Sequence, residues 1–146
     1  HIVWEISHCN GLQYNTFAQE LKELMPQDWS LFRAALKKEI ITPSYIAKFI
    51  GNKKIMLWGA SLFIKQVLEQ EKQMNSNIIG FIDKNEASWG KICGNYKIYP
   101  PEALYDLKPD GVLLTVFANN EAIYKTLKQE FAKKYPDVEL LPNIFL

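Results

Sequence analysis

A short apolar run of the sequence ends at a glycine, and the four residues from there form a predicted turn into a helix: Gly59, Ala60, Ser61 and Leu62. A turn of this kind at the start of a helix leaves backbone N–H groups unpaired, and such groups bind anions. Gly59 permits the tight turn, and the Ser61 hydroxyl adds a donor. The phosphate-binding pattern G-x-G-x-x-G would also need glycine at positions 61 and 64, where Ser61 and Ile64 stand. Two interpretations stay open: a turn that binds a ligand phosphate, or a simple connection between a strand and a helix.

A second polar group follows the next apolar run, at Asp83 and Lys84. Asp83 comes 24 residues after Gly59, close to the spacing at which an acidic side chain accepts hydrogen bonds from ribose hydroxyls. Lys84 can neutralise a phosphate or contact the edge of a base. The alternative is that Asp83, Lys84 and Asn85 form only a polar turn at the end of a strand.

Asparagines follow a third apolar run, at Asn119 and Asn120. Asn119 is a candidate ligand-binding residue, placed to contact a ligand across the cleft. Helix capping fully explains one of the two asparagines and is the interpretation we prefer, with Asn119 suited to cap a long helix. Nearby aromatic residues are interpreted as core or cleft wall rather than as a stacking platform; they are Trp58, Phe63, Phe81 and Phe117.

Composition excludes several kinds of chemistry. The two histidines, His1 and His8, and the two cysteines, Cys9 and Cys93, lack the spacing of a metal site or a Ser–His–Asp triad. Two cysteines also form no disulfide framework, which favours a reducing compartment such as the cytoplasm. The formal net charge of +1 argues against a protein that coats nucleic acid or an anionic membrane. No apolar stretch in the sequence is long enough to span a membrane as a helix.

Short apolar runs alternate with helical patterns from residue 53 onward. We expect strands at 54–58, 77–83, 95–99, 111–116 and 138–141, and helices at 61–74, at 102–107 and from Asn119. Strands separated by helices pair in parallel, and continuously apolar runs are typical of strands buried on both faces. The sequence therefore predicts an α/β domain over residues 53–146, with an open parallel sheet of about five strands and flanking helices.

The first part of the chain, residues 1–52, has a short apolar run and then helical periodicity. Asp28 is suited to cap one helix, and Thr42-Pro43 is suited to end it and to start another at 44–50. We interpret this part as a helical N-terminal segment or the end of a preceding domain. Because the chain opens with His1 rather than Met, we expect a processed chain or a piece of a longer protein.

Two stretches of the sequence carry a resemblance to a known family: KKIMLWGAS, and IIGFIDKNEASWGKICGNYKIYPPEAL. They resemble the N-terminal nucleotide-binding domain of bacterial sugar acyltransferases and related Rossmann-like modules of polysaccharide-biosynthesis enzymes that act on nucleotide-sugars. The resemblance implies a Rossmann-like fold in which Gly59, Ala60 and Ser61 approach a nucleotide or its phosphates. It also implies that Asp83 and Lys84 meet the nucleoside.

The chain departs from this family in two respects. Phe63 and Ile64 stand where a later glycine of the turn is expected, which disfavours tight binding of a dinucleotide. The hexapeptide repeats and catalytic histidine of the acyltransferases are absent from the sequence, so acetyl transfer by this chain alone is not supported. Tyr124 and Lys128 match the spacing Tyr-x-x-x-Lys, but we interpret them as a surface contact on a helix. No complete catalytic set is visible; a parent enzyme would be a sugar-modifying transferase.

Two functions are carried forward from the sequence. The first is a cytoplasmic module that binds a nucleotide-type small molecule, with a nucleotide-sugar or NAD(P) as candidates, within a larger bacterial protein of surface-polysaccharide biosynthesis. Its expected partners are other domains of that chain or further copies in a homo-oligomer, without nucleic acid and without membrane insertion. The second is a Rossmann-like protein-interaction or oligomerisation domain that has lost its ligand, which the missing glycines favour.

Overall fold

The computed structural model of the protein describes residues 29–145, with side chains from residue 35 onward. The expected apolar run at the N-terminus, the cap at Asp28, both histidines and Cys9 lie outside the described residues. The boundary between two domains at residue 52 stays a prediction.

A six-stranded sheet forms the centre of the described residues. Its strands are β1 (Ile55–Trp58), β2 (Ile78–Ile82), β3 (Ile92–Cys93), β4 (Tyr96–Tyr99), β5 (Gly111–Leu114) and β6 (Glu139–Leu140). They stand in the order β3-β4-β2-β1-β5-β6, and neighbours pair in parallel except for the antiparallel pair β3–β4. The order of the five parallel strands is that of a doubly wound α/β sheet, whose direction of winding reverses between β1 and β5. The predicted α/β fold is therefore confirmed for this part of the chain.

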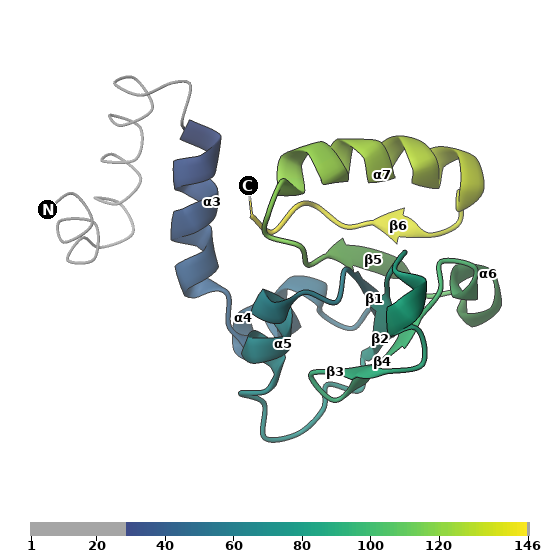
Figure 1. Ribbon diagram of the computed structural model, residues 1–146, viewed down its shortest axis with the longest axis horizontal. Coiled ribbons are helices and arrows are strands. Elements are labelled where there is room, and N and C mark those ends of the chain that lie inside the picture. The colour runs from purple at the N-terminus through teal and green to yellow at the C-terminus, as the bar shows by residue number, and fades with distance from the viewer. Residues whose placement is uncertain (1–28, 146) are drawn as a thin grey trace, which may run out of the picture.

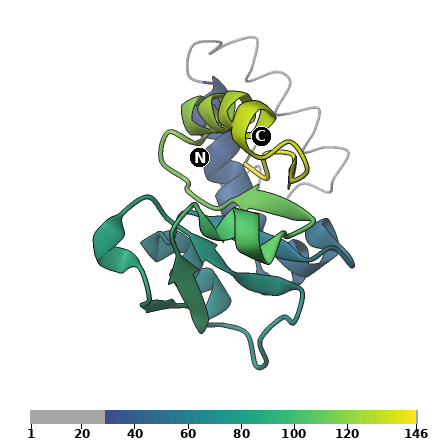
Figure 2. The same cartoon turned by 90° about the vertical axis from the view of Figure 1, so that its right-hand side faces the viewer.

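Helices cover both faces of the sheet: α4 (Pro43–Ile50) and α5 (Leu62–Leu68) lie on one face, and α7 (Asn120–Lys134) lies on the other (Figures 1 and 2). α6 (Ala103–Leu107) packs through Leu104 into the core on the α7 side, and α3 (Trp29–Ile40) stands apart from the sheet (Figure 1). The side chains of β1 alternate between the faces: Ile55 and Leu57 pack with α4 and α5, whereas Met56 and Trp58 pack with α7. All four are buried, which explains why the strand is apolar throughout.

The start of α4 confirms the predicted break at Thr42-Pro43. The Thr42 hydroxyl oxygen accepts a hydrogen bond from the backbone N–H of Tyr45 at 3.1 Å, and Pro43 is the first residue of the helix. Ile46 and Ile50 of this helix are buried in the same core as β1.

One prediction about local structure was wrong, and one strand was not predicted. The helix expected at 61–74 ends at Leu68, because the polar stretch that follows offers no apolar stripe to bury against the sheet. The antiparallel strand β3 was not expected. Gly94 and Asn95 have φ angles of 52° and 73°, so they form the two-residue turn that joins β3 to β4 as a hairpin.

Tyr96 of β4 fixes the connection between α5 and β2. Its buried hydroxyl donates to a carboxylate oxygen of Glu71 at 3.0 Å and accepts from the backbone N–H of Asn75 at 2.7 Å. Burial and the neighbouring Glu71 carboxylate raise the pKa of Tyr96 to about 12, although the Asn75 N–H opposes the shift.

The turn after β1 requires glycine for two reasons. Gly59 has a φ angle of 103°, in the region that disfavours L side chains. A Cβ atom built on Gly59 would also overlap Cγ2 of Val116, which lies beyond the end of β5. The same turn is held by Thr115, whose hydroxyl lies 2.8 Å from the Gly59 carbonyl oxygen and 3.0 Å from that of Trp58.

We predict that Tyr96→Phe destabilises the protein in a pH-dependent manner. Loss of the hydroxyl should reduce the free energy of unfolding by about 1–2 kcal/mol at neutral pH. Because the pKa of Tyr96 is raised on folding, its contribution is fully present below the pKa of an unfolded tyrosine and is lost as the pH rises toward 12. Urea unfolding at a series of pH values should therefore show the difference between the two proteins narrowing in alkali. A difference that stays constant with pH would contradict this assignment.

We predict that Gly59→Ala destabilises the protein more than Gly90→Ala does. Gly90 is a matched control because it also has a positive φ angle, 82°, but a Cβ there would meet no atom within 4 Å. The control should cost about 1–2 kcal/mol for backbone strain alone. Gly59→Ala should add a similar cost from the overlap with Val116. Urea unfolding compares the two variants, and equal losses would show that the Val116 contact is unimportant.

Candidate functional site

A cleft of about 410 Å³ opens at the carboxyl ends of β1, β2 and β5, on the face that α7 covers. The carboxyl edge of an open α/β sheet, beside the point where the strand order reverses, is where ligands of such folds bind. The cleft is lined by Trp58, Gly59, Asp83, Lys84, Val116, Ala122, Ile123, Thr126 and Leu127. Three of the residues singled out in the sequence, Gly59, Asp83 and Lys84, are thus brought together.

Asp83 binds the backbone on two sides. One carboxylate oxygen accepts from the N–H of Ala60 at 3.0 Å, and the other accepts from the N–H of Asn85 at 2.8 Å. The Asp83 carbonyl oxygen accepts from the indole N–H of Trp89 at 2.7 Å. Because a carboxylate has about four acceptor positions, these contacts leave it able to accept hydrogen bonds from a ligand hydroxyl.

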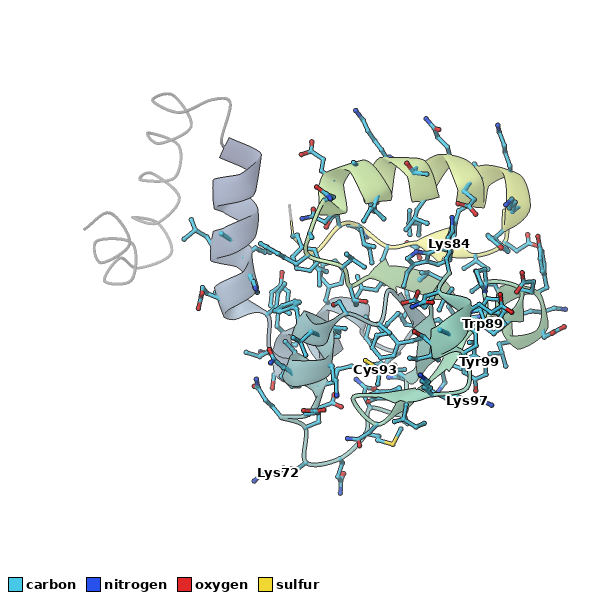
Figure 3. The ribbon with its side chains drawn as sticks, viewed as in Figure 1. Lys72, Lys84, Trp89, Cys93, Lys97 and Tyr99 are labelled. Carbon is cyan, nitrogen blue, oxygen red and sulfur yellow. The ribbon has the colours of Figure 1, made fainter. Side chains whose placement is uncertain are left out.

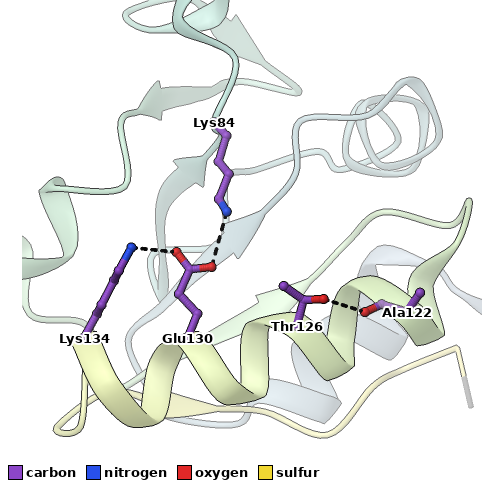
Figure 4. Close-up of polar contacts among 5 residues, drawn as sticks. All are labelled: Lys84, Ala122, Thr126, Glu130 and Lys134. Carbon is purple, nitrogen blue, oxygen red and sulfur yellow. Dashed lines mark hydrogen bonds and ion pairs between the residues drawn. The ribbon is translucent and has the colours of Figure 1, made fainter.

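Lys84 extends from the end of β2 toward α7 (Figure 3). Its Nζ lies 3.2 Å from a carboxylate oxygen of Glu130 on α7 and 5.8 Å from the centre of the Trp58 ring. Figure 4 shows this ion pair together with the second lysine on Glu130, Lys134. Lys84 therefore places a positive charge beside the aromatic wall of the cleft.

Ala60 and Ser61 are engaged within the protein rather than free in the cleft. The Ala60 N–H is the group that Asp83 holds. The Ser61 hydroxyl donates to the Thr115 carbonyl oxygen at 3.2 Å and lies 3.4 Å from the N–H of Ile64, which makes it the N-cap of α5. Leu62 is 68% exposed. None of these three residues lines the cleft.

The capping role expected of Asn119 was wrong in its detail. Asn119 occupies the position before α7, but it has a φ angle of 57° and its side chain makes no capping hydrogen bond. The side chain of Asn120 is used instead: its amide donates to the Phe117 carbonyl oxygen at 2.8 Å, and its oxygen accepts from Asn143 at 3.0 Å. Neither asparagine lines the cleft.

Residues of α7 form a wall of the cleft that sequence reasoning missed. Ala122, Ile123, Thr126 and Leu127 all line the cleft, and none of them was singled out as a site residue in the sequence. Thr126 donates its hydroxyl hydrogen bond to the Ala122 carbonyl oxygen at 3.1 Å (Figure 4). The position of this helix in the sequence could have indicated the wall. The helix follows β5, so its first turns must start at the same sheet edge as Gly59 and Asp83.

The four aromatic residues expected in the core or the cleft wall lie there. Trp58 is buried and lines the cleft, and Phe81 is fully buried. Phe63 and Phe117 pack against the core, at 5.9 and 5.7 Å from the ring of Phe145.

Other chemistry finds little support in residues 29–145. Within that range, no group of three His, Cys, Asp or Glu side chains could hold a metal ion. Burial raises the pKa of the Cys93 thiol, which disfavours a thiolate at neutral pH. No helix of this range is both long and apolar enough to cross a membrane.

Solved structures with a similar fold include the following two. One is UDP-D-quinovosamine 4-dehydrogenase from Vibrio fischeri, with 24% sequence identity, a TM-score of 0.45 and coverage of 64% of this chain and 80% of that one. The other is RSP in complex with β-NAD⁺ and operator DNA, with 16% identity, a TM-score of 0.42 and coverage of 95% and 81%. No curated protein sequence matches the chain.

A family model also matches the chain. The model described as "C2185-like, N-terminal" matches residues 51–135, a range that contains β1 to β5, the cleft and α7. The match covers more than half of the chain, so the protein belongs to the C2185-like, N-terminal family.

Proposed function

We propose that the domain at residues 53–146 binds a nucleotide or a nucleotide-sugar in the cleft at the carboxyl edge of its sheet. One observation carries the proposal: the fold brings Asp83 and Lys84 to a cleft with an apolar wall, beside the reversal of strand order. The volume of about 410 Å³ lies in the range of small-molecule sites.

The lining of the cleft suits the separate parts of such a ligand. Trp58, Ile123 and Leu127 offer apolar surface to a base or a sugar ring. Asp83 has acceptor positions for hydroxyl groups, and Lys84 supplies charge for a phosphate. The crowding of Gly59 by Val116 and the engaged N–H of Ala60 disfavour a pyrophosphate laid over the turn after β1. We therefore favour a nucleotide or nucleotide-sugar over a dinucleotide such as NAD(P).

We further propose that the domain serves a larger bacterial protein of surface-polysaccharide biosynthesis, in the cytoplasm. This part rests on the resemblance of the stretches around Gly59 and Asp83 to sugar acyltransferases and related enzymes. A transferase activity would require catalytic residues in other domains, because the cleft contains no paired acid and base beyond Asp83 and Lys84 in the described residues.

A second candidate function is a domain that binds another protein and no small ligand. The observation that favours it is the internal pairing of the polar groups: Asp83 with two backbone N–H groups, and Lys84 with Glu130. Size-exclusion chromatography and affinity capture would support this alternative if a stoichiometric partner appeared and no nucleotide changed the melting temperature.

We predict that Asp83→Ala weakens nucleotide binding at least about tenfold, the effect of losing a hydrogen bond to a charged group. Isothermal titration calorimetry with UDP-sugars, NAD⁺, NADP⁺, coenzyme A and S-adenosylmethionine identifies the ligand and measures the change. Asp110→Ala is the matched control. Its carboxylate also accepts a backbone N–H, from Lys54 at 2.8 Å, but it lies at the opposite end of the strands.

The Asp83 experiment has two outcomes that would overturn the proposed site. Either none of these compounds binds the wild-type protein, or binding is unchanged by Asp83→Ala. Asp83→Asn preserves the size of the side chain, so it separates loss of ligand contacts from loss of folding, which circular dichroism monitors in parallel.

We predict that Thr126→Trp blocks the cleft and reduces ligand affinity by more than tenfold, without a large loss of stability. Thr126 is exposed and lines the cleft, so an indole there would occupy the ligand's volume. Gln129→Trp is the control on the same helix, since Gln129 is exposed and lies outside the cleft. Equal affinities of the two variants in calorimetry would place the ligand elsewhere.

A further inference from the structure

Lys84, which lines the cleft, forms an ion pair with Glu130, a residue of α7 that lies outside the cleft. Lys84 lines the cleft from the end of β2, and Glu130 on α7 does not line it. The Lys84 side chain is 59% exposed, whereas that of Glu130 is only 15% exposed. The carboxylate is therefore a largely covered counter-ion for a lysine that solvent, or a ligand, can reach.

Glu130 has a second ion-pair partner, Lys134, so its contact with Lys84 can be lost without leaving the carboxylate unpaired. Its other carboxylate oxygen lies 3.4 Å from Nζ of Lys134, one turn further along α7 (Figure 4). If Lys84 leaves Glu130, the carboxylate still has Lys134, so no covered charge is left unpaired. Lys84, by contrast, is 59% exposed, so water solvates it when it leaves Glu130 and an anion in the cleft is able to reach it.

We propose that Glu130 forms an ion pair with Lys84 in the free protein. An anionic group of the ligand, a phosphate or diphosphate, then displaces Glu130 and pairs with Lys84 instead. This proposal deepens the proposed nucleotide-binding function and rests on it for the identity of the ligand. The pair gives the cleft a preference for anionic ligands, because an anion replaces the charge contact that Lys84 makes with Glu130, whereas an uncharged ligand does not. Lys84 also lies over the Trp58 ring, so the selected anion would sit next to the aromatic wall.

The pKa of Glu130 gives a direct measure of this exchange. Burial alone would raise this pKa, but the contacts with Lys84 and Lys134 lower it below the usual value of a glutamate. A ligand anion that draws Lys84 away should therefore raise the pKa of Glu130. The pKa is measured by NMR from the chemical shift of the Glu130 side-chain carboxyl carbon as a function of pH. The signal is assigned by its absence in Glu130→Gln.

The test uses inorganic pyrophosphate, which carries the anionic chemistry without a nucleoside, and then the nucleotide that calorimetry identifies. In the full chain, Lys84→Met should raise the pKa of Glu130, and millimolar pyrophosphate should raise it in the wild type but not further in Lys84→Met. Lys134→Met is the matched control: it also removes a lysine from Glu130, but the response to pyrophosphate should remain. Glu130→Gln should bind pyrophosphate about two- to fivefold more tightly, the effect of losing a competing exposed ion pair.

The outcomes separate this inference from the proposed function. The exchange is overturned if the pKa of Glu130 is unchanged in Lys84→Met, or if it responds neither to pyrophosphate nor to a bound nucleotide. Neither result contradicts nucleotide binding itself. A response to pyrophosphate with no binding of any nucleotide supports the exchange of anions and overturns the proposed nucleotide ligand. A response to nucleotide and not to pyrophosphate also supports the exchange, and shows that the nucleoside is needed to deliver the phosphate.

Discussion

The turn after β1 is held from both neighbouring strands, and the geometry of the sheet edge depends on this clamp. On one side the hydroxyl of Thr115 bonds to the carbonyl oxygens at the end of β1; on the other the carboxylate of Asp83 accepts the N–H of Ala60. Thr115 is fully buried, so its hydroxyl has no water to exchange with and must keep these partners. The ends of three strands are thereby fixed relative to one another, and the cleft inherits its shape from them.

The clamp uses some of the polar groups at this sheet edge for structure and leaves others available for the proposed recognition of a ligand. Ser61 and the N–H of Ala60 are used to hold the turn, although their residue types are those of a phosphate-binding turn. Asp83 has the capacity for both purposes, because its two backbone contacts leave acceptor positions unused. Under the proposed function, recognition of a ligand falls to Asp83, to Lys84 and to the wall formed by α7 rather than to the turn itself.

The sequence was sufficient for the parallel α/β sheet and the positions of its main strands, because the apolar runs around Ile55, Ile78 and Val112 are buried on both faces and therefore lack polar interruptions. The order of the strands in the sheet was not predicted. The sequence was also sufficient to bring Gly59, Asp83 and Lys84 to one edge, since parallel strands end together. The orientation of individual polar groups could not be predicted from the sequence. Whether Ser61 faces a ligand or the Thr115 carbonyl depends on contacts between residues far apart in the chain. The hairpin at Gly94-Asn95 was within reach, because that dipeptide is a known turn signal.

Both edges of the sheet end in strands of two residues, β3 on one side and β6 on the other. Such short edges offer few unpaired backbone groups to an incoming strand, and Pro142, just after β6, lacks a backbone N–H altogether. The sheet is in this sense self-limiting, and edge-to-edge growth into larger β assemblies is disfavoured. Within the described residues, the surface open to other domains or to further copies of this chain consists mainly of helices and loops.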